Sequence, residues 1–175
     1  LQNRWPDIMA EQLNAGGGKT YGVLNLGIGG NCVVRGGLSE PATKRFDRDI
    51  LGQKGVTAVV IFEGINDIGG SDGRSEQMAG ELIVAYKDFI KKAHSRGLKA
   101  YVATITPFGN SFYDKGNRFK EAARQTVNEW MRTSKEHDGV IDFDKAMRDP
   151  AHPSQLREEW QEDWLHPNAD GYRAM

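Results

Sequence analysis

The sequence predicts an α/β fold, a three-layer α/β/α sandwich in which helices cover both faces of a parallel sheet. Apolar residues at helical spacing alternate with short apolar runs along the chain. The run at residues 57–64, TAVVIFEG, is continuous and bounded by turn residues, as in a strand buried on both faces. The 175 residues, 38% of them hydrophobic, suit one core, and no linker or repeat interrupts them. We therefore predict a single domain over residues 1–175.

The first half of the chain predicts two helices and two strands. Residues 5–13 have the pattern of an amphipathic helix, which the glycines at 16–18 would end. Residues 21–27, YGVLNLG, predict a short buried strand. Residues 46–51, FDRDIL, predict a helix, and the run at 57–64 predicts the second strand.

The second half continues the alternation. A long helix is expected from Ser75, a candidate N-cap, to Gly97, a candidate stop. Its apolar positions at helical spacing are Met78, Leu82, Tyr86, Phe89, Ile90 and Ala93. Residues 98–105 predict a third strand, 119–131 a helix and 139–143 a fourth strand.

Three loops that follow strands are the candidate functional segments, because ligands of such sheets bind beyond the carboxyl ends of the strands. They are NLGIGGN at 25–31, EGINDIGG at 63–70 and DWLHP at 163–167. Each also has a purely structural explanation. The glycines could form turns, Asn66 and its neighbour could cap a helix, and Asp163 could cap a helix that holds His166. Together, however, the loops would meet at one edge of one sheet.

The residues of these loops are the parts that acyl transfer needs. Gly30 can supply a backbone N–H, and Asn66 a side-chain amide, to hold the oxyanion of a tetrahedral intermediate. His166 can take and return the proton of a hydroxyl nucleophile, and Asp163, expected one helical turn away, can orient the imidazole. We therefore predict an acyl-transfer site.

The three loops resemble the second, third and fifth conserved blocks of the SGNH hydrolases, also called the GDSL esterase/lipase family. Further similarity at 4–13, 45–51 and 105–113 resembles the branch of esterases from xylan-degrading systems. The resemblance implies a flavodoxin-like sheet and a serine esterase. It would make Gly30 and Asn66 oxyanion donors, His166 the general base and acid, and Asp163 its orienting residue. Gly64 would be the small residue that lets the third block approach the site.

The resemblance also suggests substrates and a compartment. Short-acyl esters, acetyl among them, on a plant-polysaccharide sugar fit the branch, whereas aryl esters and lysophospholipids fit an open site equally well. A secreted or periplasmic protein is favoured by the family, although the residues alone leave the compartment open. No cofactor is expected.

One family feature is missing, namely the Gly-Asp-Ser block whose serine is the nucleophile. Ser71 lies just beyond the Asn66 loop, but the family's serine comes from a different loop and also donates its own N–H. We therefore expect the serine, and the strand before it, upstream of Leu1. That strand would lie in the middle of the sheet, so its omission would leave exposed strand edges and a long apolar slot. The stop at Met175, where a last helix has barely begun, suggests trimming there too.

Other functional classes fit less well. A net charge of −1 without a basic stripe argues against nucleic acid, and no apolar run is long enough to cross a bilayer. The GIGGN turn does not complete a dinucleotide motif, and the four histidines include no HExxH pattern. Cys32 is the only cysteine, so no intrachain disulfide or cysteine-based metal site is possible.

The alternative from another class is a non-catalytic carbohydrate-binding or remnant domain. It would lack a nucleophile and could use Trp160, Trp164 and Tyr113 as stacking platforms, although aromatics also pack in cores. Such a domain would not need Asp163 together with His166.

Overall fold

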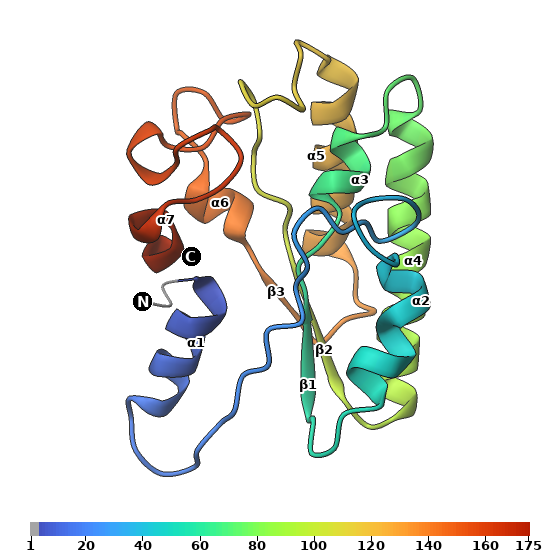
Figure 1. Ribbon diagram of the computed structural model, residues 1–175, viewed down its shortest axis with the longest axis vertical. Helices are drawn as coiled ribbons and strands as arrows, with labels where there is room; N and C mark the ends of the chain where they lie inside the picture. Colours follow the sequence, from blue (N-terminus) through green and yellow to red (C-terminus); the bar gives the residue numbers. More distant parts are fainter. Residues whose placement is uncertain (1–3) are drawn as a thin grey trace.

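The computed structural model describes residues 4–175, so the first three residues of the predicted domain lie outside it. A parallel sheet with the strand order β1-β2-β3 runs through the middle of the molecule, between helices on both faces (Figure 1). The strands are β1 (Ala58–Ile61), β2 (Lys99–Ala103) and β3 (Gly139–Ile141). All three point the same way, so their carboxyl ends share one edge of the sheet.

The helices divide between the two faces (Figure 1). On one side lie α2 (Ala42–Phe46), a π-helical turn (Asp47–Leu51), α3 (Ile65–Gly69), α4 (Ser75–Ser95) and α5 (Arg118–Thr133). On the other side lie α1 (Trp5–Asn14), α6 (Phe143–Met147), a 3-10 turn (Glu158–Trp160) and α7 (Ala169–Ala174). Within residues 4–175, no helix is both long and apolar enough to cross a membrane.

The core forms where α4 packs on the sheet. The buried apolar side chains of α4 recur every three or four residues and are Met78, Ala79, Leu82, Ala85, Tyr86, Phe89, Ile90 and Ala93. Burying each large side chain contributes roughly 1.5–3 kcal/mol. The ring of Phe89 stacks on Phe46 of α2 with the centroids 4.5 Å apart. The periodicity of this helix therefore accounts for much of the packing between the sheet and one helical layer.

Most predicted elements are confirmed. The strands at 57–64, 98–105 and 139–143 are present and slightly shorter, and the helices at 5–13 and 119–131 are present. Two details of the helices differ. Ser75 is the first residue of α4 rather than its N-cap, and residues 46–51 are the end of α2 followed by a π-helical turn.

The predicted strand at 21–27 is wrong, because this segment pairs with no strand in the described part of the chain. Its polar backbone atoms bond to side chains instead. Asn14 exchanges two hydrogen bonds with the backbone of Tyr21, and Arg45 donates to the carbonyl oxygen of Leu26. The side chain of Leu24 is 62% exposed. A strand needs a hydrogen-bonded neighbour, and β1 lies on the far side of a groove.

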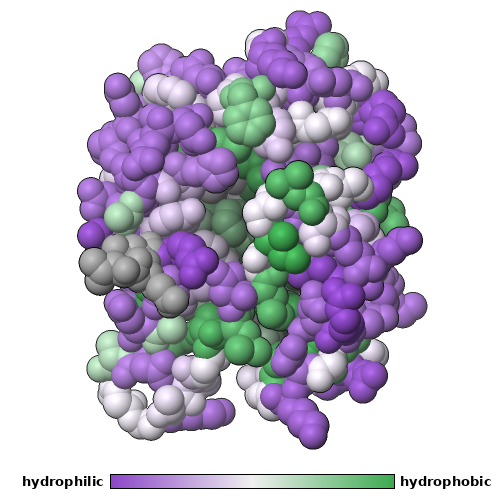
Figure 2. Space-filling model, viewed as in Figure 1, coloured by the Kyte–Doolittle hydropathy of each residue, from purple (hydrophilic) through white to green (hydrophobic). Residues whose placement is uncertain are grey.

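That groove, here called the apolar groove, is a cavity of about 580 Å³ between the 19–27 segment, α1, α2 and β1. Its apolar walls include Met9, Leu24, Val60, Phe62 and Phe89. Figure 2 shows apolar side chains along the hollow between the two halves of the molecule. Within residues 4–175, β1 pairs only with β2, so its other edge borders the groove. Of the two exposed strand edges that the sequence predicted around an apolar slot, only the edge of β1 is present, because residues 21–27 form no strand.

Candidate active site

The first site loop begins with a glycine turn. Gly30 has a φ of +69°, and a Cβ there would lie 2.7 Å from Leu38, so a larger residue would be strained and crowded. The loop is fixed from behind by the buried guanidinium of Arg45, which donates to Asn31 Oδ1 at 2.9 and 2.8 Å. The Gly30 N–H donates no hydrogen bond within residues 4–175. It is therefore a candidate oxyanion donor on a fixed loop.

A second glycine makes the transition from β1 to α3. Gly64 has a φ of +114°, and a Cβ there would lie 2.4 Å from the hydroxyl of Tyr86. That hydroxyl donates to the carbonyl oxygen of Glu63 at 2.7 Å. Gly64 therefore lets the chain turn sharply into α3 against the core.

The first turn of α3 ties the two loops together. Asn66 Nδ2 donates to the carbonyl oxygen of Asn31 at 2.8 Å. The carboxylate of Asp67 accepts the N–H groups of Val33 at 2.8 Å and Val34 at 3.0 Å. Burial raises the pKa of Asp67, although these two N–H donors pull it down. Asn66 and Asp67 thus hold the loop that carries the Gly30 N–H at a fixed distance from the Asn66 amide.

Asp163 and His166 lie in a loop that the antiparallel bridge between Gln161 and Pro167 closes, so the expected helical turn is wrong. Trp164 takes a left-handed φ of +62°, which turns the chain sharply between them. His166 Nδ1 nevertheless lies 2.7 Å from Asp163 Oδ2, and Asp163 Oδ1 also accepts the backbone N–H groups of Leu165 and His166.

These contacts set the charge and tautomer of the pair. Burial alone would raise the pKa of Asp163, but the N–H of His166, its imidazole and the N–H of Leu165 hold that pKa below its usual value. The carboxylate is therefore ionised near neutral pH and can only accept, so Nδ1 carries the proton. Nε2 has no partner among the described residues and is available as a proton acceptor.

A pocket of about 540 Å³ brings the three loops together. Its lining comprises Gly30, Cys32, Arg35, Gly36, Gly37, Leu38, Asn66, Asp67, Gly70, Arg74, Met78, Phe112, Tyr113, Leu165 and His166. Gly30, Asn66 and His166 therefore line one pocket, and Asp163 contacts His166. Gly64 does not line the pocket and lies against Tyr86.

The lining of this pocket includes no serine among the described residues. Ser71 is buried; its hydroxyl donates to the carbonyl oxygen of Ile68 at 2.7 Å and lies 2.9 Å from the Ser75 hydroxyl. Cys32 does line the pocket, but burial, followed by the nearby Asp67 and Glu63 carboxylates, raises its pKa to about 11. A thiol with that pKa stays protonated near neutral pH, so Cys32 is a poor nucleophile.

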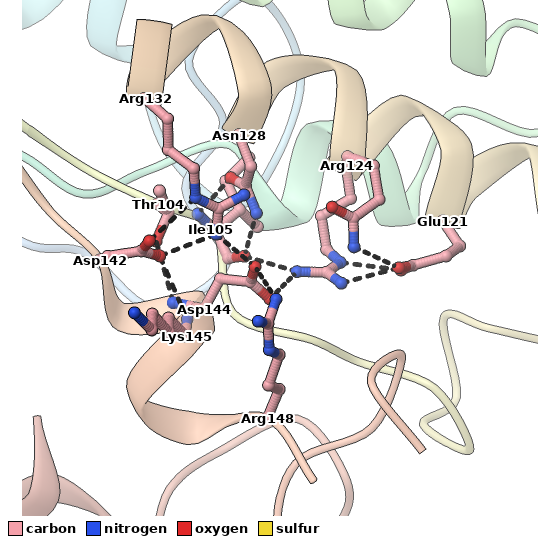
Figure 3. A network of polar contacts seen from close by, with 11 residues as sticks. Thr104, Ile105, Glu121, Arg124, Asn128, Arg132, Asp142, Asp144, Lys145 and Arg148 are labelled. Carbon is pink, nitrogen blue, oxygen red and sulfur yellow. Dashed lines mark hydrogen bonds and ion pairs between the residues drawn. The ribbon is translucent and has the colours of Figure 1, made fainter. Parts of the chain in front are cut away.

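A buried polar network anchors the loops after β2 and β3 (Figure 3). Arg124 on α5 is fully buried and donates to the Ile105 carbonyl oxygen at 2.9 Å and to Asp144 at 2.6 Å. Asn128 bonds both the N–H and the carbonyl oxygen of Ile105, each at 2.8 Å. Arg132 pairs with Asp142 and Asp144. Asp142 and Asp144 are each paired with arginine, and the network joins α5 to the loops at the site-bearing edge of the sheet.

The other candidate residues lie outside this arrangement. The side chain of His152 is 68% exposed, 3.7 Å from Asp149. Trp160 packs under the guanidinium of Arg157, 4.9 Å from the ring centroid. Within residues 4–175, no three His, Cys, Asp or Glu side chains are grouped as a metal site would require.

Sequence reasoning missed several pocket residues. Tyr113 was considered only as a sugar-stacking residue, yet its hydroxyl bonds Asn66. Arg35, Arg74 and Phe112 also line the pocket. Two signals were available. Residues 105–113 follow the third predicted strand, which puts them at the same sheet edge, and they resemble the family branch.

Comparison with known proteins places these features in context. The model of the GDSL-like Lipase/Acylhydrolase family matches residues 1–174. No curated protein matches the chain significantly. A solved structure of a proposed lipolytic protein of the G-D-S-L family from Desulfitobacterium hafniense DCB-2 has a TM-score of 0.70 and 21% identity, over 98% of this chain and 83% of that one.

Two Bacteroides proteins are also similar. A GDSL-like lipase from Bacteroides thetaiotaomicron has a TM-score of 0.61 and 16% identity, over 75% of this chain and 63% of its own length. A proposed acylhydrolase from Bacteroides fragilis has a TM-score of 0.56 and 16% identity, over 75% of this chain and 62% of that protein. At these identities the likeness establishes the fold, and it confirms the predicted α/β/α architecture.

Proposed function

The chain belongs to the GDSL-like lipase/acylhydrolase family, and from this premise we propose that it is a serine esterase of short-acyl esters. The observation that carries the proposal is the meeting of His166, oriented by Asp163, with Gly30 and Asn66 in one pocket. An imidazole with a free Nε2 and two N–H donors are the parts that acyl transfer uses.

In the proposed mechanism a serine hydroxyl attacks the ester carbonyl carbon and forms a tetrahedral intermediate. His166 Nε2 takes the hydroxyl proton and passes it to the leaving alcohol as the C–O bond breaks, which leaves an acyl-enzyme. A water molecule then gives a proton to His166 Nε2 and attacks the acyl carbon. The bond to the serine oxygen breaks, His166 returns the proton to that oxygen, and the carboxylic acid leaves. Asp163 stabilises the imidazolium, and the Gly30 N–H and Asn66 amide hold the oxyanion.

We place the nucleophilic serine on a segment upstream of Leu1, at the carboxyl end of a strand that fills the apolar groove. Two observations support this placement. The edge of β1 beside the groove has no strand partner within residues 4–175. The groove also runs from the 19–27 segment to Glu63, at the sheet edge that bears the site loops. A parallel strand there would extend the sheet and end beside those loops.

For the substrate we propose a small ester, with an acetyl group on a carbohydrate as the first choice. The branch similarity at residues 105–113 supports this choice, and that segment supplies Phe112 and Tyr113 to the pocket. Aryl and lysophospholipid esters are the comparison substrates.

Replacing His166 by Ala in the full-length protein tests the proposal. Hydrolysis of p-nitrophenyl acetate and of acetylated xylo-oligosaccharides should fall roughly 10³-fold or more, because the proton acceptor is lost. His152→Ala is a matched control, since both side chains are 68% exposed and only His166 lines the pocket. Asp163→Asn should cost less than His166→Ala, though still a large factor, through the wrong tautomer.

Unchanged turnover in His166→Ala, with circular dichroism like that of the wild type, would reject the esterase assignment. Affinity for unacetylated xylo-oligosaccharides without any turnover would instead support a carbohydrate-binding domain.

A further inference from the structure

The two ends of the Asn66 amide have different partners. The Asn31 carbonyl oxygen can only accept, so the amide nitrogen must face it, at 2.8 Å. The amide oxygen then faces Tyr113, whose hydroxyl must be the donor, at 2.9 Å. One N–H of the amide remains without a partner among the described residues, and Asn66 lines the pocket.

The Tyr113 hydroxyl is suited to be a lasting donor. Burial raises the pKa of this phenol, with Cys32 and Asp67 as further causes in the same direction. The hydroxyl therefore keeps its proton across the neutral range, and its single hydrogen is directed at Asn66 Oδ1.

The backbone and ring of Tyr113 are held in place independently of that hydroxyl. The buried Lys120 ammonium donates to the carbonyl oxygens of Tyr113, at 2.9 Å, and Gly69, at 2.7 Å. The ring packs directly on Gly69, where a Cβ would come within 2.4 Å of it. The loop after β2 is thus clamped to the end of α3, and the ring would stay there without its oxygen.

We propose that Tyr113 is a positioning residue that orients the Asn66 amide so that its second N–H faces the oxyanion. The proposal rests on the proposed role of Asn66 as an oxyanion donor. An amide held at both ends needs no reorientation when charge develops, whereas an amide held only by Asn31 can rotate about its last torsion. The effect of Tyr113 on the reaction is therefore exerted through Asn66.

A double-mutant cycle in the full-length protein tests this. Tyr113→Phe keeps the ring on Gly69 and removes only the hydroxyl. Its kcat should fall about tenfold with little change in KM, because one hydrogen bond used in the transition state is lost. Asn66→Ala should lower kcat by roughly a hundred to a thousandfold. Adding Tyr113→Phe to Asn66→Ala should cost nothing more. Tyr101→Phe, in β2 with its ring against Gly139, is the control and should not change kcat.

Four results would overturn the proposal, and they lead to different conclusions. If Tyr113→Phe has the kcat of the wild type while Asn66→Ala is impaired, the positioning role of Tyr113 is rejected and the oxyanion role of Asn66 stands. Multiplicative losses in the double variant, or a change in KM only, would make Tyr113 an independent substrate contact. Full activity in Asn66→Ala would reject the oxyanion role itself. Equal melting temperatures for Tyr113→Phe and wild type would show that the loss is not due to unfolding.

Discussion

At the scale of single residues, the site depends on carboxylates whose surroundings differ. Asp163 is held ionised by three donors, so it can orient His166 near neutral pH. Glu63, which follows β1 and lines the apolar groove rather than the pocket, behaves in the opposite way. Burial raises its pKa to about 7, although Arg45, 3.1 Å away, lowers it and Asp67 raises it further.

Glu63 should make stability fall as pH rises. In the unfolded chain its pKa is near the ordinary 4.5, and in the folded protein about 7, so between these values the folded protein binds more protons. The free energy of unfolding contributed by Glu63 is therefore fully present below 4.5 and lost as pH rises through 7. Glu63→Gln should remove this decline.

Urea unfolding at about pH 5 and about pH 8 measures the effect. Glu129→Gln, at an exposed position of α5, is the control and should keep the wild-type difference between the two pH values. If Glu63→Gln keeps the wild-type difference in unfolding free energy between the two pH values, a group other than Glu63 causes that difference.

At the scale of elements, the β1–α3 connection depends on one glycine. Gly64→Ala should destabilise the fold by at least about 1–3 kcal/mol, because a non-glycine residue is strained at a φ of +114° and its Cβ meets the Tyr86 hydroxyl. The measurement is the urea midpoint.

Gly80→Ala is the control, and it should change stability in the opposite direction. Gly80 is in the interior of α4 with open space around it, so alanine should stabilise the fold by about 0.5–1 kcal/mol. A Gly64→Ala midpoint equal to that of the wild type would reject the account of this turn.

The elements also show what the sequence could predict. The strand in residues 57–64 and the helix from Ser75 have strong local patterns, and both are confirmed. Residues 21–27 also have apolar residues in a short run but form no strand, because pairing depends on a neighbour that a local pattern does not contain. Residues of all three site loops nevertheless meet at one pocket, although only the loop at 63–70 comes directly after a strand of the sheet.

Two features of α5 and its preceding loop could not be predicted. Lys120, Arg124 and Asn128 recur every four residues and all point inward, against the usual exposure of such residues. Their partners are carbonyl oxygens and carboxylates on other elements, which the sequence of the helix does not reveal. The bond from Tyr113 to Asn66 is hidden for the same reason, since it joins residues 47 positions apart.

At the scale of the whole molecule, the two helical layers pack differently on the sheet. The helical layer with α4 packs closely on the sheet, whereas α1 and the 19–27 segment are separated from β1 by the apolar groove (Figure 2). A large apolar hollow beside an unpaired strand edge is a favourable place for one more strand. In the proposed esterase, such a strand would end in the serine whose proton His166 accepts.

The most direct test is to treat the full-length protein with a fluorophosphonate and to determine its intact mass and peptide map. An activated serine would form an O–P bond as fluoride leaves, and His166 would accept the proton. We expect one adduct, on a serine upstream of Leu1, and His166→Ala should abolish it. An adduct on Ser71 or another serine of residues 1–175, or no adduct at all, would contradict it.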